Sequence, residues 1–422
     1  MRAALLCLLL LLLGGCATRG ALDISCPQFA ELRHDLPLSP LEQEIHGDTG
    51  QHSLAVAAPA QQADLTRRFS DTMGVQRPQA VGVPRGEPAV VLLSGGGQWG
   101  AFGAGYLDQL RRDGKLPAFA VVTGVSTGSL QSLFVAVDSD ESYAALLRAY
   151  APASEKEIVD RGPTWTALFT GSFAGLKPLR KRIEQALCPD AALTDPNQRC
   201  TLDALRELKG RKTVLIGFVR ATSGTFQYVD AVDVAALPRP EARACLTGAA
   251  LASAAMPVDF QQVKINHETY YDGGTRSSVF EANIAAAADA AIRLRHALLG
   301  DQPAPGTPEP LLPIYVVRNG PTTVVPEPDV DTKGDALTAA MRAEAIVVNQ
   351  LEVGSIAAIR IEHPTGALRL VTADDWTKVG CIKPPGVMFD PTFMQCLTAL
   401  GRTRAQASEP WIDLSPIAAP HP

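Results

Sequence analysis

The sequence predicts an α/β fold with a mostly parallel central sheet flanked by helices. Residues 89–94 form a continuous apolar run, which is typical of a strand buried on both faces. A glycine turn and a helical stretch at 100–112 follow it. The same order returns at 119–122, where the glycine-bounded segment 123–128 leads into a second helical stretch at 129–137. Strand, glycine turn and helix repeated in this order indicate a parallel sheet.

The rest of the chain continues this alternation. Further strands are expected at 213–221, 225–230 and 311–317, and further helices at 176–187, 242–254, 281–299 and 335–359. The proline-rich segments 302–313 and 321–328 indicate loops. Asp390 and Pro391 suit the cap and first residue of a last helix, which should run to about Leu400 and end at Gly401.

Composition favours a folded protein without a nucleic-acid partner. Of the 422 residues, 46% are hydrophobic and 19% are charged, which excludes wholesale disorder and supplies material for a core. The formal net charge is −6 and no long run of Lys or Arg occurs. A surface that neutralises nucleic-acid phosphates therefore has no visible basis in the sequence.

Residues 1–15 are predicted to be a lipoprotein signal peptide. A basic start precedes the apolar run at 3–13, which is too short for a permanent membrane span. Leu13-Gly14-Gly15-Cys16 resembles the bacterial lipobox, so Cys16 is expected to be acylated and to become the new N-terminus. An ordinary secretory signal with a chance cysteine is the alternative. Ala17, which is not Asp, implies the periplasmic face of the outer membrane.

Six further cysteines indicate disulfides, because the periplasm is oxidising. Six cysteines allow about 15 pairings, and free buried thiols are the alternative. Local closure favours two short links and leaves one long link, so the expected pairs are Cys188 with Cys200, Cys381 with Cys396, and Cys26 with Cys245. The sequence has no CxxC pair or His/Cys cluster, so no metal site is expected.

Gly124-Val125-Ser126-Thr127-Gly128 fits the GxSxG pattern and lies between a predicted strand and helix. A nucleophile on a sharp turn needs small neighbours, and the following helix directs its N-terminus toward the reacting centre. Ser126 is therefore the candidate nucleophile. A purely structural turn is the alternative.

A second glycine-rich segment, Gly95-Gly96-Gly97-Gln98-Trp99-Gly100, follows the first predicted strand. It matches GxGxxG, but the acidic residue that a dinucleotide site expects at the end of the second strand is missing. The same glycines can turn backbone N–H groups toward an oxyanion formed beside Ser126. We therefore expect the backbone of Gly95, Gly96 and Gly97 to form an oxyanion hole.

The third motif is Tyr270-Tyr271-Asp272-Gly273-Gly274, in which Asp272 is a candidate base. A simple β-turn that begins at Asp is the alternative. A buried carboxylate can act directly as a base because burial raises its pKa. For a Ser-His-acid triad, His363 is the most serious candidate, whereas His296 and His421 suit a solvated helix face and a tail.

In this order, the glycine loop, GxSxG and DGG resemble the patatin-like phospholipases from about residue 89 to 281. The block at 252–257 and Phe389-Asp390-Pro391 with Gly401 fit the same family. The resemblance implies a patatin-like three-layer fold, Ser126 as nucleophile, Asp272 as its base and no cofactor. Two departures stand out: Gln98-Trp99 replaces a basic residue, and 275–279 lacks the usual Asn or Pro.

The resulting hypothesis is a lipid acyl hydrolase that cleaves acyl esters of phospholipids or related lipids through a Ser-Asp dyad and an acyl-enzyme. A broad esterase or lysophospholipase is the first alternative, and a non-catalytic envelope binding protein is the second. The expected organisation is a lipid-anchored tether at 16–85 with a helix near 59–71, a catalytic core at 86–285, and a part at 286–422 that packs on the same domain. Trp165, Phe169 and Phe173 are candidates for an apolar pocket wall, although core packing is commoner for such spacing.

Overall fold

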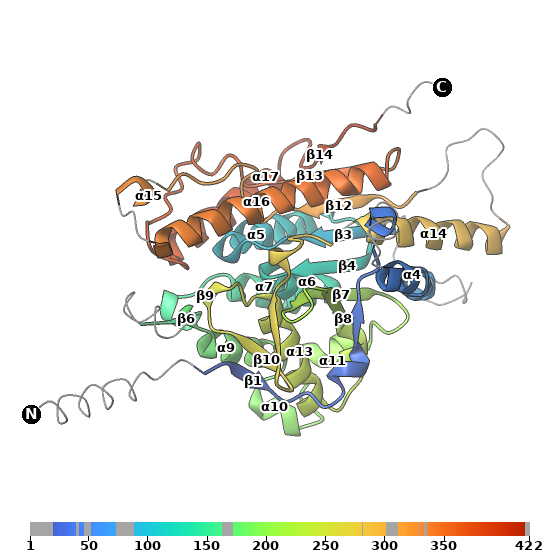
Figure 1. The fold of residues 1–422 in the computed structure, drawn as a ribbon, viewed down its shortest axis with the longest axis horizontal. Helices are drawn as coiled ribbons and strands as arrows, with labels where there is room; N and C mark the ends of the chain where they lie inside the picture. The colour runs from blue at the N-terminus through green and yellow to red at the C-terminus, as the bar shows by residue number, and fades with distance from the viewer. Residues whose placement is uncertain are drawn as a thin grey trace, which may run out of the picture.

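The computed structural model describes residues 20–38, 42–45, 52–72, 88–162, 172–280, 282–300, 311–327, 329–332 and 336–417. Over these residues the chain is a mixed α/β fold, with a large, mostly parallel central sheet flanked by helices (Figure 1), which confirms the predicted fold class. Cys16, Trp165 and Phe169 lie outside the described residues.

The centre of the sheet is a block of parallel strands, and antiparallel strands extend it at the sides. The parallel strands lie in the order β7 (Thr213–Arg220), β4 (Phe119–Val125), β3 (Ala89–Leu93), β12 (Ile314–Val317) and β13 (Leu368–Val371). The antiparallel pairings involve β8 (Phe226–Asp230), β10 (Val263–Ile265), β11 (Glu268–Asp272) and β14 (Ile412–Asp413). Strands β12 and β13 thus place part of residues 286–422 in the same sheet as β3, the strand that precedes the glycine-rich segment 95–100.

The central strands are apolar on both faces, and alternate residues enter two separate cores. Val91 and Leu93 of β3 belong to one core, and Val90 and Leu92 belong to the other. The first core receives α5 (Gly100–Arg112), α6 (Thr127–Val137), α13 (Arg239–Ser253) and α17 (Pro391–Ala405). The second receives α4 (His52–Thr72), α14 (Ala282–Leu299) and α16 (Ala336–Glu362). The result is three layers, helix, sheet and helix.

Shorter elements complete the fold. They are α2 (Phe29–Leu32), α7 (Asp140–Ala149), α9 (Lys177–Leu187), α10 (Asp190–Thr194), α11 (Thr201–Arg206), α12 (Ala231–Ala235), α15 (Asp329–Thr332), the strands β5 (Asp160–Arg161), β6 (Ser172–Gly175) and β9 (Val258–Phe260), and the 3₁₀ turns η1 (Gly97–Trp99), η2 (Glu155–Glu157) and η4 (Gly273–Thr275). Helices α9, α10, α11 and α13 gather at the lower end of the view in Figure 1, away from α16 at the upper end.

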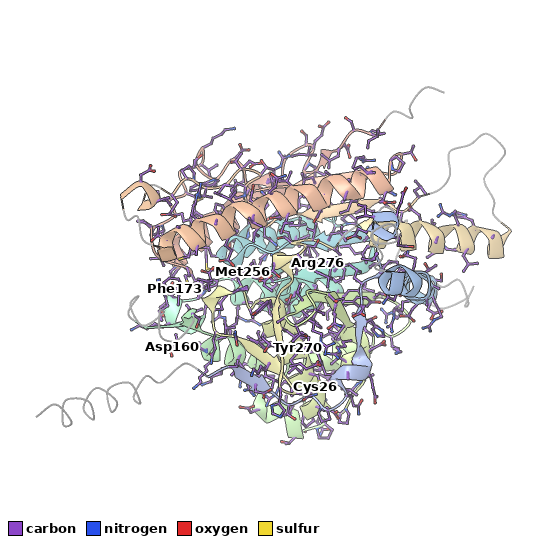
Figure 2. All side chains as sticks on the ribbon, viewed as in Figure 1. Cys26, Asp160, Phe173, Met256, Tyr270 and Arg276 are labelled. Atoms are coloured by element: carbon purple, nitrogen blue, oxygen red, sulfur yellow. A yellow bond between two sulfur atoms is a disulfide. The ribbon has the colours of Figure 1, made fainter. Side chains whose placement is uncertain are left out.

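The N-terminal part differs from the expected tether of limited structure. β1 (Leu22–Ile24) adds to the sheet parallel to β10, and β2 (Arg33–Asp35) pairs with β8. Phe29 packs on Phe218 and Tyr270 with ring centroids 5.6 Å away in each case. Figure 2 labels Tyr270 and Cys26. Three-residue strands carry too little alternation to be recognised from sequence, so their pairing with distant strands could not be predicted.

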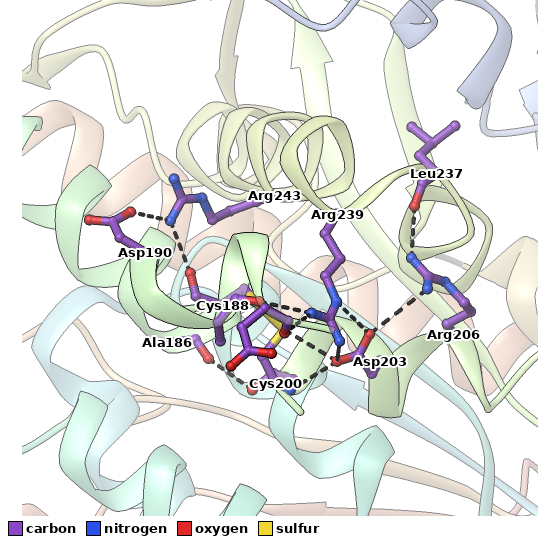
Figure 3. The surroundings of a disulfide bond; sticks show 12 residues. Ala186, Cys188, Asp190, Cys200, Asp203, Arg206, Leu237, Arg239 and Arg243 are labelled. Carbon is purple, nitrogen blue, oxygen red and sulfur yellow. Dashed lines mark hydrogen bonds and ion pairs between the residues drawn. A yellow bond between two sulfur atoms is a disulfide. The ribbon is translucent and has the colours of Figure 1, made fainter. Parts of the chain in front are cut away.

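The described cysteines form three disulfides. They are Cys26–Cys245, Cys188–Cys200 and Cys381–Cys396, with Cα atoms 5.1, 5.0 and 5.6 Å apart, and they are the pairs expected from the sequence. The first joins the N-terminal segment to α13. The second lies among α9, α10 and α11, as Figure 3 shows. Within the described ranges, no helix combines the length and apolar character that crossing a membrane requires.

The sequence had indicated that the last helix ends at Gly401, but the helix continues past this residue. Gly401 lies inside α17 and is buried, and a Cβ atom there would lie 2.2 Å from the carbonyl oxygen of Phe102 in α5. A Cβ atom on Gly105 of α5 would lie equally close to the carbonyl oxygen of Thr398. The glycines therefore allow two helix backbones to approach closely, and the helix continues to Ala405.

We predict that Gly401→Ala lowers the free energy of unfolding by about 1–3 kcal/mol, the usual cost of overpacking. Gly354→Ala is the matched control, because Gly354 lies on α16 and a Cβ there would meet nothing within 4 Å. This second change should stabilise the protein by about 0.5–1 kcal/mol, since alanine suits a helix better than glycine. Urea unfolding of both oxidised variants measures the difference, and equal effects would refute the close-packing explanation.

Candidate active site

The two central residues of the site lie where two strands meet end to end. Strand β4 runs parallel to β7, with Val125 opposite Gly217, and β11 runs antiparallel to β7, with Asp272 opposite Phe218. Strand β8 pairs with residues 215–219 of β7, so β4 and β11 share the other edge. Ser126 directly follows β4, and Asp272 ends β11. The sheet register therefore brings Ser126 and Asp272 together although they are far apart in sequence.

The turn at Ser126 has the geometry of a nucleophile elbow. Ser126 has φ 52° and ψ −123° and caps the N-terminus of α6, a backbone conformation that costs energy in a non-glycine residue. A Cβ on Gly124 would lie 2.2 Å from the oxygen of Gly128, and one on Gly128 would lie 2.2 Å from the oxygen of Leu93. The turn therefore requires both glycines of the GxSxG pattern. It also places Ser126 at the positive end of the α6 dipole.

The block at 252–257 holds both residues in position, which sequence reasoning did not foresee. Ser253 Oγ accepts a hydrogen bond from the Ser126 amide at 2.8 Å and donates one to the Gly217 carbonyl at 2.6 Å. The carbonyl of Ala255 accepts the Asp272 amide at 3.1 Å. The C-terminal end of α13 and the residues directly after it thus fix the backbone of the nucleophile and the carboxylate.

Asp272 is buried, and the Ser126 side chain is close enough to lower the pKa of its carboxyl group. Its Oδ1 also accepts the Gly274 amide at 2.7 Å. Burial raises the pKa of Asp272 to about 7, a nearby charge on Asp259 adds to the rise, and the bonds from Ser126 and Gly274 oppose it. A carboxylate with a pKa near neutrality can accept the proton of a serine hydroxyl.

The glycine loop faces Ser126, but the backbone amides of its three glycines differ in their hydrogen bonds. The Gly95 amide donates to the Ser278 carbonyl at 3.0 Å, so it is not free to bind an oxyanion, and Gly95 instead leaves room beside Ser126. In the described part of the chain, the amides of Gly96 and Gly97 have no protein acceptor. Both glycines have positive φ values, 136° and 57°. Gly96 and Gly97 thus remain as candidate oxyanion donors.

The residues at which the sequence departs from the family pattern, Gln98, Trp99 and 275–279, make contacts that hold the glycine loop. Gln98 Oε1 accepts the Asp390 amide at 3.0 Å. The ring of Trp99 makes edge contacts with Trp376 and Phe393, with centroids 5.3 and 5.0 Å away. The C-terminal part therefore anchors the glycine loop where a basic residue was expected. On the other side, the segment 275–279 supports the loop through the Ser278 carbonyl.

His363 does not complete a triad with Ser126. Its ring is fully buried, and Nδ1 lies 2.8 Å from Oδ2 of Asp289 in α14. The carboxyl group whose pKa the Ser126 side chain affects is that of Asp272. Among the described residues, no group of three His, Cys, Asp or Glu side chains is arranged to hold a metal ion.

Two more carboxylates lie close enough to act electrostatically on the site. Burial raises the pKa of Asp259 to about 6, with Arg161 opposing the rise. Burial, with Asp259 and Asp272 adding to it, raises the pKa of Glu344 to about 8. Neither residue belongs to a motif, so only the folded arrangement reveals this concentration of negative charge. Such repulsion opposes full ionisation of Asp272.

A large cavity begins at Ser126. It has a volume of about 1100 Å³ and is lined near the nucleophile by Gly97, Ser126, Thr127, Leu130, Ala254, Phe260, Phe389 and Met394. Phe173, a candidate wall residue, lies on β6 and is not part of the lining. The arrangement can therefore present an activated hydroxyl to a substrate that has a large apolar part.

One comparison with known proteins identifies a family over the core of the chain. Residues 91–284 match the model of the family described as patatin-like phospholipase, which confirms the resemblance of the motifs. Among solved structures, VipD from Legionella pneumophila matches with a TM-score of 0.33 and 13% sequence identity, covering 76% of this chain and 67% of that one. The comparison with curated proteins gives no match.

The raised pKa of Asp272 predicts that ionisation of this residue lowers the stability of the folded protein. Its folded-state pKa of about 7 exceeds the value near 3.9 of an unfolded Asp, so the stability it contributes is present below about pH 4 and is lost as pH rises through 7. Asp272→Asn should therefore raise the free energy of unfolding at about pH 8 by about 1–4 kcal/mol, with a smaller gain at about pH 5.

Asp160→Asn is the control for this measurement, because Asp160 lies exposed on β5. Urea unfolding of the oxidised protein at the two pH values provides the comparison. A destabilised Asp272→Asn protein at the higher pH would contradict the assigned burial of a charged carboxylate.

Proposed function

Residues 91–284 form a patatin-like phospholipase domain, and from this premise we propose that the protein is a serine acyl hydrolase acting on lipid esters. Members of this family are, in general, lipid acyl hydrolases. The observation that carries the finer proposal is the sheet register that brings Ser126 beside the buried Asp272, with Ser126 lining an apolar cavity. Ser126 is the nucleophile and Asp272 is its base.

In the first half of the reaction, Asp272 accepts the proton of Ser126 while Oγ attacks the ester carbonyl carbon. The carbonyl oxygen takes up the negative charge, and the amides of Gly96 and Gly97 bind it. One such donor is typically worth about 3 kcal/mol of transition-state stabilisation. Collapse of the tetrahedral intermediate breaks the bond to the alcohol, which leaves with the proton from Asp272. The acyl group stays on Ser126.

In the second half, water replaces the alcohol. Asp272 accepts a proton from the water, whose oxygen attacks the acyl carbon, and the same two amides bind the second oxyanion. Collapse releases the fatty acid and returns the proton to Ser126. Of the groups used in these steps, Ser126 and Gly97 line the cavity, and the strained Ser126 turn keeps Oγ oriented throughout.

We further propose that the protein acts at the bacterial envelope, held by a lipid on Cys16 at the periplasmic face of the outer membrane. The sequence Leu13-Gly14-Gly15-Cys16 and the three disulfides support export to an oxidising compartment. The substrate would then be a phospholipid or related lipid of the membrane to which the enzyme is attached.

The anchoring proposal predicts that Cys16→Ser moves the protein from the membrane fraction to the soluble fraction of the producing cells. The replacement removes the thiol to which the lipid would be attached. Mass spectrometry of the N-terminal peptide provides the second measurement. In the protein without the substitution, Cys16 is expected to be acylated. If the N-terminal peptide of the protein without the substitution carries no acyl group, the proposal is contradicted.

For catalysis, we predict that the purified full-length protein releases fatty acid from phospholipid vesicles and that Ser126→Ala lowers kcat by at least about a thousandfold, since the nucleophile is lost. Asp272→Asn should lower kcat by about a hundredfold or more because an amide cannot accept the proton. Chromatography of the released acids measures both rates, with Ser132→Ala as the control, because the Ser132 hydroxyl of α6 bonds the Ser129 carbonyl and not the nucleophile.

Full activity of a folded Ser126→Ala protein would exclude the proposed nucleophile. Cleavage of single-chain lysophospholipids and short esters without cleavage of vesicles would favour the broad esterase instead. No turnover of any ester by the unmodified protein would favour a binding protein that retains the fold.

A further inference from the structure

Two buried amide side chains, Asn319 and Gln131, lie between the glycine loop and the helix that follows the nucleophile. Asn319 directly follows β12, and Gln131 lies on α6, five residues after Ser126. Their exposed fractions are 2% and 0%. Neither residue belongs to a motif, and neither lines the cavity. A polar side chain in such a position is costly unless its hydrogen bonds are made.

The two amides bind each other through reciprocal hydrogen bonds. Asn319 Nδ2 donates to Gln131 Oε1 at 2.9 Å, and Gln131 Nε2 donates to Asn319 Oδ1 at 3.1 Å. Each nitrogen also has a second acceptor. For Asn319 it is the carbonyl of Ser94 at 2.8 Å, and for Gln131 it is the carbonyl of Gly100 at 2.7 Å. All four amide hydrogens are therefore used, and a fully paired buried network of this kind is rigid.

The two carbonyls lie at opposite ends of the glycine loop. Ser94 directly precedes the loop, and Gly100 begins α5 directly after it. The hydroxyl of Ser94 adds to the attachment, because it accepts the Asn319 amide at 2.9 Å and donates to the Gly95 carbonyl at 2.8 Å. The loop is thus attached at its start to Asn319 and at its end to Gln131.

Glycines leave the space that this pair occupies. A Cβ atom on Gly96 would lie 1.9 Å from the carbonyl oxygen of Asn319. On Gly103 of α5, a Cβ atom would lie 2.3 Å from Asn319 Oδ1 and 2.7 Å from Gln131 Nε2. The backbones of the loop and of α5 therefore lie directly against the pair.

Gln131 also fixes the loop relative to the nucleophile. Ser126 caps the N-terminus of α6, and backbone hydrogen bonds hold the turn of helix that separates Ser126 from Gln131. The amides of Gly96 and Gly97, the candidate oxyanion donors, lie between the two attached ends of the loop. The pair therefore joins these donors to the helix that the nucleophile begins.

We propose that Asn319 and Gln131 are positioning residues, which hold the two candidate oxyanion donors of the loop at the separation from Ser126 that an oxyanion requires. Such donors act about 2.7–3.1 Å from the position of the oxyanion, and a misplacement of about 1 Å can cost about a hundredfold in rate. The proposal rests on the function proposed above and adds to it two residues outside the cavity lining.

The first test is Asn319→Asp, which keeps the size of the side chain. It replaces a nitrogen that donates two hydrogen bonds with an oxygen, so that at most one of the two can remain. With p-nitrophenyl butyrate and the full-length oxidised protein, kcat should fall at least about tenfold. KM should stay within about threefold, because a change confined to transition-state stabilisation leaves substrate binding unaltered.

Gln131→Met is the second variant, because it keeps the length of the side chain and removes its bonds to Asn319 and Gly100. It should act in the same direction. Asn349→Asp is the matched control, since the Asn349 amide of α16 donates to the Thr322 carbonyl at 3.3 Å instead of to the glycine loop. This control should leave kcat and KM unchanged.

A transition-state analogue separates positioning from a merely structural role. An alkyl trifluoromethyl ketone adds to the serine hydroxyl, and the resulting oxyanion requires the same donors as the ester. Its inhibition constant should rise by about the factor by which kcat/KM falls in both variants. Partial unfolding would only lower the active fraction and leave that constant unaltered. An inhibition constant that neither variant changes, or an equal rise in Asn349→Asp, would overturn the proposal.

Hydrogen exchange separates this proposal from the proposed catalysis, because it requires no turnover. The amides of Gly95 and Trp99 are hydrogen bonded at the two ends of the loop. Both variants should speed exchange in the peptide that contains them and leave exchange in β8 unaltered. If the protein without substitutions cleaves no ester but this increase occurs, the catalytic proposal fails and the positioning of the loop stands. Unchanged exchange in both variants would refute it, whatever the activity.

Discussion

The close approach of Ser126 to the buried Asp272, whose pKa the Ser126 side chain lowers against the effect of burial, is the constraint on which the rest of this structure depends. It exists because β4 and β11 share one edge of β7 and meet there end to end. Neither strand could be shifted by a residue without separating the two side chains, since successive strand residues face opposite sides of the sheet. The apolar strands that form the core thus also determine the geometry of the site.

Several supports act on this pair from different parts of the chain. Ser253 holds the Ser126 amide, Ser278 holds the glycine loop, and Trp99 joins that loop to the C-terminal helix α17 through Phe393. The C-terminal part is therefore needed by the site even though the motifs precede it. The cost of burying Asp272 and of the positive φ at Ser126 falls on this surrounding structure.

Sequence patterns predicted the elements that carry periodic apolar residues or glycine turns, including β3, β4 and α5. They also indicated Ser126 and Asp272, because glycines that the backbone geometry requires leave a visible motif. Gly401 was misinterpreted because a glycine needed for close helix contact looks the same in sequence as one that ends a helix. The roles of Ser253, Gly95 and Asn319 depend on long-range contacts, which local patterns do not encode.

The most direct test of this account is the rate at which a fluorophosphonate labels Ser126, followed by peptide mass spectrometry from about pH 5 to about pH 9. The reagent traps only an activated serine, so the rate constant should rise with pH around a midpoint near 7, where Asp272 loses its proton. Asp272→Asn should remove this dependence and slow the labelling. Labelling of another residue, or a rate independent of pH and of Asp272, would contradict the proposed dyad.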